Sequence, residues 1–190
     1  IGQILQLSRL EGLPQVEFQS VDLSAMLEEI ILDAAFEAES QNKRVIFQHQ
    51  NYAVMAGNSD LLSSAIENVL RNAIHYAQRS IQVVLLTVNQ VNRITITDDG
   101  PGVNDALLAA LFTPFYRLSE ARDRDSGGVG LGLAIAKQAV SLHGGHITAT
   151  NVTGGGLRVC IELPIARQTP SELDKNTAKA EHIKCQLQPD

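Results

Sequence analysis

The sequence predicts an α+β sandwich in which helices cover one face of a mixed β-sheet. Four stretches carry apolar residues at helical spacing, the first of them short, and seven short stretches show the alternation typical of β-strands. These stretches do not follow one another in regular βαβ order, so the pattern favours segregated helices on a mixed sheet. No internal repeat is visible.

The first ten residues place four apolar side chains near one helical stripe, which Gly12 and Pro14 end. The stripe is cut off at its start. We therefore expect residues 1–14 to be the end of a longer helix and the chain to be a fragment of a larger protein.

The next part of the chain predicts two helices and three strands. Residues 16–23 alternate like an edge strand, and Ser24 is a plausible N-cap for a helix that ends at about Ser40. Two short strands follow on either side of a polar turn, and either Asn58 or Ser59 caps the second helix. Their predicted ranges are 44–48 and 52–56.

The second half contains a hairpin, a long glycine- and proline-containing segment, a helix and two closing strands. The hairpin strands are 80–88 and 93–97, and the helix covers about 130–142. The closing strands are 146–151 and 157–163. Beyond Pro164 the chain is polar and patternless, so we expect the tail at 167–190 to be disordered.

Composition excludes some classes of function. The net charge of −6 argues against nucleic acid as a partner, because a phosphate backbone attracts basic surfaces. Cys160 and Cys185 lack metal-like spacing, and we expect no disulfide between them, which favours a reducing compartment. No apolar run reaches the roughly 18 residues of a membrane span.

The first polar cluster lies in the second predicted helix. Asn68, Asn72, His75 and Tyr76 recur at three- and four-residue spacing, so their side chains can share one helix face. Asparagine is a poor helix former, and its amide oxygen is a suitable Mg²⁺ ligand beside phosphate oxygens and water. A solvated polar stripe explains this cluster equally well when it is taken alone.

The second cluster, residues 97–102, reads Thr-Asp-Asp-Gly-Pro-Gly and directly follows a strand. Its glycines and proline favour a sharp turn close to a ligand, and a carboxylate there can accept a hydrogen bond from an exocyclic amine such as that of adenine. In isolation, an ordinary β-turn would be the better interpretation.

The third and fourth clusters suggest a lid and a phosphate-binding turn. Residues 112–117 gather three aromatic side chains beside a proline, as a lid or a small satellite core would. Residues 127–135 form a glycine-rich loop that enters an apolar helix, whose N–H groups can bind phosphate. Its GxGxG spacing fits neither a Rossmann motif nor a P-loop, and the protein-kinase motifs are missing.

In this order, the four clusters resemble the ATP-binding domain of sensor histidine kinases, within the group that includes gyrase, Hsp90 and MutL. The resemblance covers about 21–164 and implies a Bergerat-type fold, a two-layer sandwich with a mixed five-stranded sheet and about three helices on one face. The flanking stretch 119–128 resembles the cell-envelope-stress sensor kinases.

The resemblance implies a catalytic set of Asn68, Asn72 and His75, with ATP and Mg²⁺ as cofactors. Asn72 matches the asparagine that coordinates Mg²⁺, and Asn68 matches its neighbour on the phosphate side. His75 stands where the family usually has lysine or arginine, so its role is open. Gyrase-like ATPases have a glutamate base where this chain has Asn68, which implies slow hydrolysis of bound ATP.

The resemblance also implies the residues that bind the nucleotide. Tyr76 stacks near adenine, Asp98 reads it, and Gly100 and Gly102 shape that pocket. A lid is implied at about 103–127, its mobile part at 113–127. The remaining implied positions, on the lid and the phosphate side, are Phe115, Arg117, Arg122, Arg124, Gly128, Gly130, Leu131, Gly132 and Leu133.

These matches imply a protein-histidine kinase domain at 15–166. It transfers the γ-phosphate of ATP to a histidine on a dimerisation domain, for relay to a response regulator. None of the five histidines has the acceptor context, so the fragment is expected to lack the acceptor. It is also expected to be a monomer, because the family dimerises through a hairpin that residues 1–10 are too short to replace. The full-length protein is expected to be a homodimeric inner-membrane sensor with this domain in the cytoplasm. The alternatives are a gyrase- or chaperone-like ATPase and a nucleotide-sensing regulatory domain.

Overall fold

The computed structural model describes residues 16–49, 53–116 and 130–165. In chain order the elements are β1 (Gln19–Asp22), α2 (Leu23–Ser40), β2 (Arg44–His49), β3 (Val54–Gly57), α3 (Ser59–Tyr76), β4 (Ser80–Val88), β5 (Val91–Asp98), the 3₁₀-helix η1 (Asp105–Phe112), α4 (Gly132–Leu142), β6 (His146–Asn151) and β7 (Leu157–Pro164).

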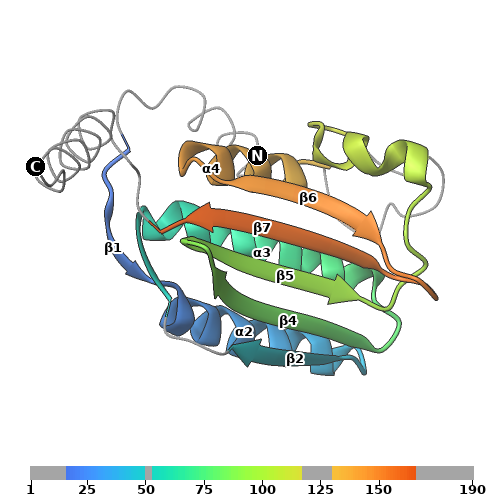
Figure 1. The fold of residues 1–190 in the computed structure, drawn as a ribbon. Coiled ribbons are helices and arrows are strands. Elements are labelled where there is room, and N and C mark those ends of the chain that lie inside the picture. Colours follow the sequence, from blue (N-terminus) through green and yellow to red (C-terminus); the bar gives the residue numbers. More distant parts are fainter. Residues whose placement is uncertain (1–15, 50–52, 117–129, 166–190) are drawn as a thin grey trace, which may run out of the picture.

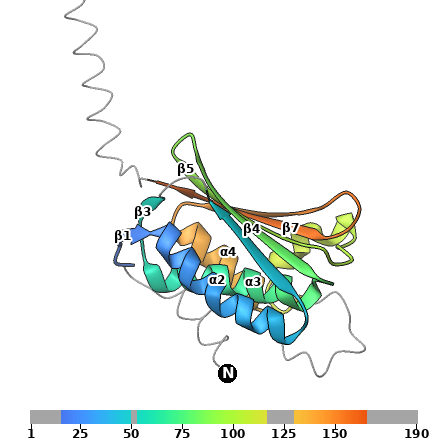
Figure 2. The same ribbon diagram turned by 90° about the horizontal axis from the view of Figure 1, so that it is seen from below.

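Five strands form the main sheet in the order β2-β4-β5-β7-β6. β2 runs parallel to β4, and the other neighbours are antiparallel. Helices α2, α3 and α4 all lie on the same face of this sheet (Figure 1), and the view from below shows the resulting two layers (Figure 2). The predicted α+β sandwich, with a mixed five-stranded sheet and about three covering helices, is confirmed.

The core lies between the sheet and the helices because the strands alternate. In β5, Ile94 and Ile96 are buried against the helices, whereas Arg93 on the other face is exposed and pairs with Glu162 at 2.7 Å. Ile94 lies between Leu85 of β4 and Ile161 of β7 in the register. Burying each such side chain contributes about 1.5–3 kcal/mol, far more than an exposed ion pair.

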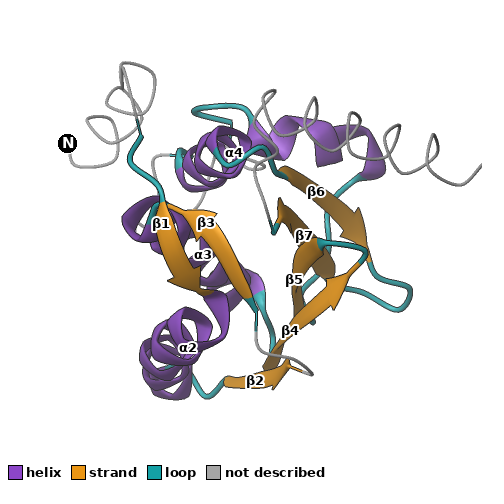
Figure 3. Cartoon of the chain, turned by 60° about the vertical axis from the view of Figure 1, so that its left-hand side comes forward, coloured by secondary structure: helices purple, strands orange, loops and turns teal. Residues whose placement is uncertain are grey.

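The two short strands around the polar turn belong to different sheets. β2 joins the main sheet, where Arg44 is paired with Ser80, while β3 pairs antiparallel with β1 and places Met55 opposite Val21. Figure 3 shows the β1–β3 ribbon beside the helices, apart from the main sheet. A parallel neighbour needs a crossover connection, and here α3 provides it between β2 and β4.

The predicted N-cap at Ser24 is wrong. Helix α2 begins at Leu23, and the Asp22 carboxylate caps it by accepting hydrogen bonds from the N–H groups of Ser24 at 3.0 Å and Ala25 at 3.1 Å. Ser24 is buried, and its hydroxyl accepts a hydrogen bond from the Ala53 N–H. The Asn58 cap on α3 is confirmed by a 3.1 Å bond from the Leu61 N–H to its side chain.

Candidate functional site

Helix α3 carries the first predicted cluster, which changes from buried to exposed along its length. Asn68 is 8% exposed, Asn72 is half-buried, and Tyr76 is 43% exposed. The four-residue spacing on an observed helix places these three side chains on one face. His75 is exposed beside them, and its ring meets that of Tyr76 edge-on at 4.6 Å.

The amide of Asn68 lies against the start of α4. Its Nδ2 donates to the Ser64 carbonyl at 2.8 Å. A Cβ atom at Gly132 would lie only 3.0 Å from Asn68 Oδ1, closer than ordinary packing allows. The sequence-predicted glycine at this position therefore lets the first residue of α4 approach the asparagine cluster.

The N-terminus of α4 presents backbone N–H groups that no side chain in the described part of the chain caps. Its N-cap residue, Leu131, is buried and forms no capping hydrogen bond. The first N–H groups of a helix have no partners inside the helix, and together with the helix dipole they favour an anion. Gly130 precedes them with a φ of 74°, and Leu133 is buried in the core.

Asp98 ends β5 and is only 6% exposed. Its Oδ1 accepts hydrogen bonds from the N–H groups of Gly100 at 2.8 Å and Leu157 at 3.3 Å. Burial raises the pKa of this carboxyl above its ordinary 3.8, against the lowering effect of these two bonds. Since both bonds fall on Oδ1, Oδ2 can accept a hydrogen bond from a ligand.

Gly100 brings the second cluster against the end of α3. A Cβ atom there would lie 2.5 Å from the Tyr76 carbonyl oxygen and 2.8 Å from Asp98 Oδ1. Any side chain would thus force the turn away from the helix. Gly102 has a φ of 72°, which also favours glycine. The structure brings Asn68, Gly132, Tyr76, Gly100 and Asp98 together along α3.

Two polar groups that no motif in the sequence predicted hold this arrangement. Lys43, which precedes β2, donates from Nζ to the Ile74 carbonyl at 2.6 Å at the C-terminal end of α3. Such a cation satisfies an unpaired carbonyl and interacts favourably with the helix dipole. No local pattern in the sequence connects positions 43 and 74.

The second missed group is Asp99, which accepts hydrogen bonds from three successive N–H groups, those of Gln78, Arg79 and Ser80, at 2.8–3.2 Å. Its carboxylate fixes the connection that follows Tyr76. Burial acts to raise the pKa of Asp99, but these bonds outweigh it and hold the pKa below 3.8. An aspartate directly after a strand is the only sequence signal for this role.

We expect Asp99→Asn to destabilise the domain at neutral pH, because an amide nitrogen replaces one of the two acceptors. A carboxyl whose pKa is depressed in the folded state adds stability above its unfolded pKa of about 3.9, and loses it as the pH falls through the folded value. With allowance for solvent exposure, the loss is about 1 kcal/mol, or about 2–4 °C in Tm. Thermal unfolding from pH 7 to 3 should show the two Tm curves converge; parallel curves would contradict this role.

Several predicted site residues lie outside the described ranges. These are Arg117, Arg122, Arg124 and Gly128. The predicted helix end at 1–14 and the predicted tail at 167–190 also lie outside these ranges. The described start of the predicted lid contains η1. Phe112 is buried, whereas Phe115 is 61% exposed with a φ of 63°. The Phe115 N–H donates to the Gly130 carbonyl at 2.9 Å.

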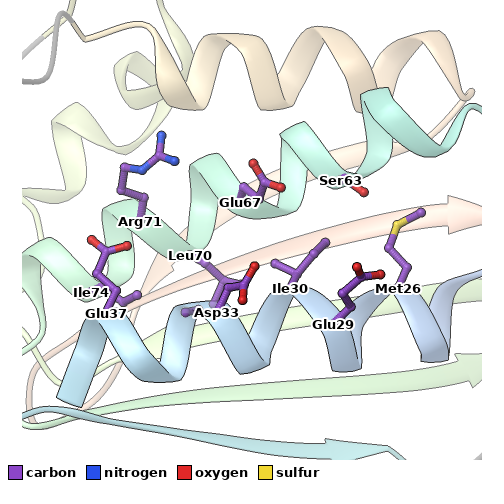
Figure 4. Close-up of a pocket in the computed structure, with 11 residues that line it drawn as sticks. Met26, Glu29, Ile30, Asp33, Glu37, Ser63, Glu67, Leu70, Arg71 and Ile74 are labelled. Atoms are coloured by element: carbon purple, nitrogen blue, oxygen red, sulfur yellow. The ribbon is translucent and has the colours of Figure 1, made fainter. Parts of the chain in front are cut away.

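A separate groove between α2 and α3 has a volume of about 400 Å³ (Figure 4). Acidic side chains of α2 face Glu67 and Arg71 of α3 across it. None of the predicted site residues lines this groove. Glu67 and Arg71 stand one position before Asn68 and Asn72, respectively. Successive residues of a helix point in different directions, so Glu67 and Arg71 lie on a different side of α3 from the two asparagines. The groove is therefore distinct from the candidate site.

Two further findings concern the part of the chain that the structure describes. No group of three or more His, Cys, Asp or Glu side chains there could hold a metal ion by itself. Among the same residues, no helix is both long and apolar enough to cross a membrane.

The chain is similar in sequence to known ATPases and sensor kinases. The family model of the histidine kinase-, DNA gyrase B- and HSP90-like ATPases (HATPase_c) matches residues 57–167. The sensor histidine kinase CpxA of Escherichia coli (strain K12) is 37% identical over 170 residues, which are 89% of this chain and 37% of that protein. The chain thus spans a little over a third of the length of this relative.

Solved structures show the same fold. Full-length ShkA in complex with AMPPNP has a TM-score of 0.77 and 20% identity, covering 88% of this chain and 35% of that chain. The mycobacterial sensor histidine kinase MprB has a TM-score of 0.66 and 26% identity, covering 77% of this chain and 97% of that chain. At such identities the likeness to ShkA shows the fold alone.

Proposed function

This chain belongs to the family of histidine kinase-, DNA gyrase B- and HSP90-like ATPases, and from that premise we propose that it binds Mg-ATP and donates the γ-phosphate to a histidine on a dimerisation domain. The family resemblance predicted from the four motifs is confirmed. The activity of the whole protein is our proposal, supported by the similarity to CpxA.

One observation carries the proposal: α3 has the proposed phosphate-side group at one end of its polar face and the proposed adenine-side group at the other. Asn68 lies against the uncapped start of α4, and the Tyr76 carbonyl lies against Gly100, next to Asp98. Eight residues of helix separate Asn68 from Tyr76, about 12 Å. In the similar fold of ShkA, the structure contains AMPPNP.

We propose Asn72 as the protein's ligand for Mg²⁺. Its side-chain amide is half-buried and lies one turn after Asn68. An amide oxygen suits Mg²⁺, which keeps several waters and takes its other ligands from phosphates. When bound, the ion would neutralise charge on the transferring phosphoryl group.

The absence of a glutamate at position 68 favours a kinase over an ATPase. Asn68 cannot accept a proton from water, and its Nδ2 is already bonded to Ser64. Bound ATP would then persist until an acceptor histidine arrives. A gyrase- or chaperone-like ATPase remains the second candidate, and steady hydrolysis of ATP by this chain would favour it. A nucleotide-sensing regulatory domain would bind ATP without transferring phosphate.

The partners and the wider arrangement follow as proposals from the same premise. We assign residues 15–166 to the ATP-binding domain, and residues 1–14 to the end of the dimerisation helix. The phosphohistidine would pass its phosphoryl group to a response regulator. In the full-length protein, we propose a homodimeric membrane sensor that carries this domain in the cytoplasm.

The decisive experiment mixes this chain with labelled ATP, Mg²⁺ and a separate dimerisation-hairpin domain. We expect phosphohistidine on the hairpin only. Incubated alone, the chain should bind nucleotide as a monomer without acquiring phosphate, because the predicted acceptor context is missing from its histidines. Acid-labile phosphate on the isolated chain would contradict the missing acceptor, and a dimer in dilute solution would contradict the predicted monomer.

A further inference from the structure

We propose that Asn151 is a positioning residue for the adenine side of the nucleotide site, acting through the segment from Gly102 to Asp105. The inference rests on the proposed function, because it concerns the pocket in which Asp98 would read the base. Asn151 is the last residue of β6, an edge strand of the main sheet.

The side chain of Asn151 uses both ends of its amide on one short segment. Its Oδ1 accepts a hydrogen bond from the Val103 N–H at 2.9 Å. Its Nδ2 donates to the Val103 carbonyl at 2.5 Å and to Asp105 Oδ1 at 2.6 Å. Three bonds thus tie the edge of the sheet to the chain between the second cluster and η1.

Before Asp105, this segment has no regular secondary structure of its own. Residues 101–104 lie between the turn at Gly100 and the start of η1, outside any helix or strand. Side-chain bonds from β6 therefore add to the core packing of Val103 in fixing where their backbone lies. Gly102 contributes directly, since a Cβ atom there would lie 2.8 Å from Asn151 Oδ1.

The end of the β6–β7 hairpin also holds the other side of the second cluster. Gly156 packs so closely on the Asp98 carbonyl that a Cβ atom could not fit, and the Leu157 N–H donates to Asp98 Oδ1. The Val152 N–H closes the hairpin turn by donating to the Gly156 carbonyl at 3.0 Å. One hairpin end thus fixes residues 98–105 at two places, Asp98 and Val103.

Position 151 requires an amide side chain. The side chain there must accept a hydrogen bond from one backbone N–H and donate hydrogen bonds to both a carbonyl and a carboxylate. The amide of asparagine can make all of these bonds simultaneously. An aspartate of the same shape would lose both donors and would place a negative charge beside Asp105. Asn151→Asp therefore breaks the contact with almost no change in volume.

The test measures the Kd of ATP and of inorganic triphosphate, each with Mg²⁺, for the parent, Asn151→Asp and the double variant Asn151→Asp/Asp105→Asn. We expect Asn151→Asp to raise the Kd of ATP about three- to tenfold, as the loss of one or two hydrogen bonds implies. Triphosphate affinity should be unchanged because it lacks the base. The double variant should recover part of the loss, since an amide at position 105 can donate to the new carboxylate.

Thr148→Asp is the matched control, because it adds the same charge to the exposed face of β6. In the phosphotransfer assay, Asn151→Asp should raise the KM for ATP and leave kcat unchanged. Equal ATP affinity in the parent and Asn151→Asp would overturn the inference. Three other results would also overturn it: equal losses of affinity for ATP and triphosphate, no recovery of ATP affinity in the double variant, or the same loss of ATP affinity in Thr148→Asp. A parent chain that binds no ATP would instead refute the proposed function.

Discussion

Asn72→Ala is expected to abolish productive Mg-ATP binding while leaving the fold intact. The substitution removes the amide oxygen that we assign to Mg²⁺ and puts the best helix former at a half-buried position of α3. Phosphotransfer to a separate dimerisation-hairpin domain should fall below detection. Thermal stability should stay equal or rise slightly, because alanine is favoured over asparagine in a helix by about 0.5 kcal/mol.

The measurement is the affinity for ATP with Mg²⁺ and with EDTA, in the parent and the variant. The parent should bind more tightly with Mg²⁺, and the variant should show no difference between the two conditions. Arg71→Ala is the matched control, since it makes the same replacement one position earlier on a different side of the helix. A variant that keeps the Mg²⁺-dependent gain would sink the assignment of Asn72.

Asp98→Asn is expected to weaken the binding of adenine nucleotides by about 1–3 kcal/mol, the range for a buried hydrogen bond whose partner is left unpaired. The substitution removes the charge and can present an amide nitrogen where an acceptor is needed. Gly100 and Leu157 can still donate to the remaining oxygen, so the turn should persist. Calorimetric titration with ATP and GTP provides the check, and equal losses for both would argue against recognition of the base.

The raised pKa of Asp98 adds a pH dependence to this prediction. Burial favours the neutral form, so the carboxylate takes up a proton at a higher pH than an ordinary aspartate with a pKa of 3.8. Adenine affinity in the parent should therefore fall as the pH drops through this raised value. Asp98→Asn has no such group, so its weaker binding should lack that step in the same titration.

Much of the fold could be predicted because it depends on local patterns. The apolar spacing of α3 and the alternation of β4 and β5 determine which faces are buried, and Asn58 caps its helix through a residue three positions away. The glycines at positions 100 and 132 were likewise visible as motif residues. Their positions in the structure now give a physical reason for each, namely the close approach of Tyr76 and of Asn68.

The rest depends on contacts between distant parts of the chain. Nothing local shows that β3 pairs with β1 and that β2 pairs with β4, because both strands have similar short apolar patterns. Asp22 and Ser24 are both good capping residues, and only the burial of Ser24 against Ala53 decides between them. Asn151 and Lys43 act on partners 48 and 31 positions away, so no window of the sequence contains both members of either pair.

The hydrogen bond between Phe115 and Gly130 has a consequence for how this domain can vary. It holds together the two ends of the intervening segment, so the rest of the fold constrains where the segment begins and ends. The bond joins backbone atoms only, the N–H of Phe115 just after η1 and the carbonyl of Gly130 just before α4. These two elements are therefore tied to each other by a contact that requires no particular side chain at either position.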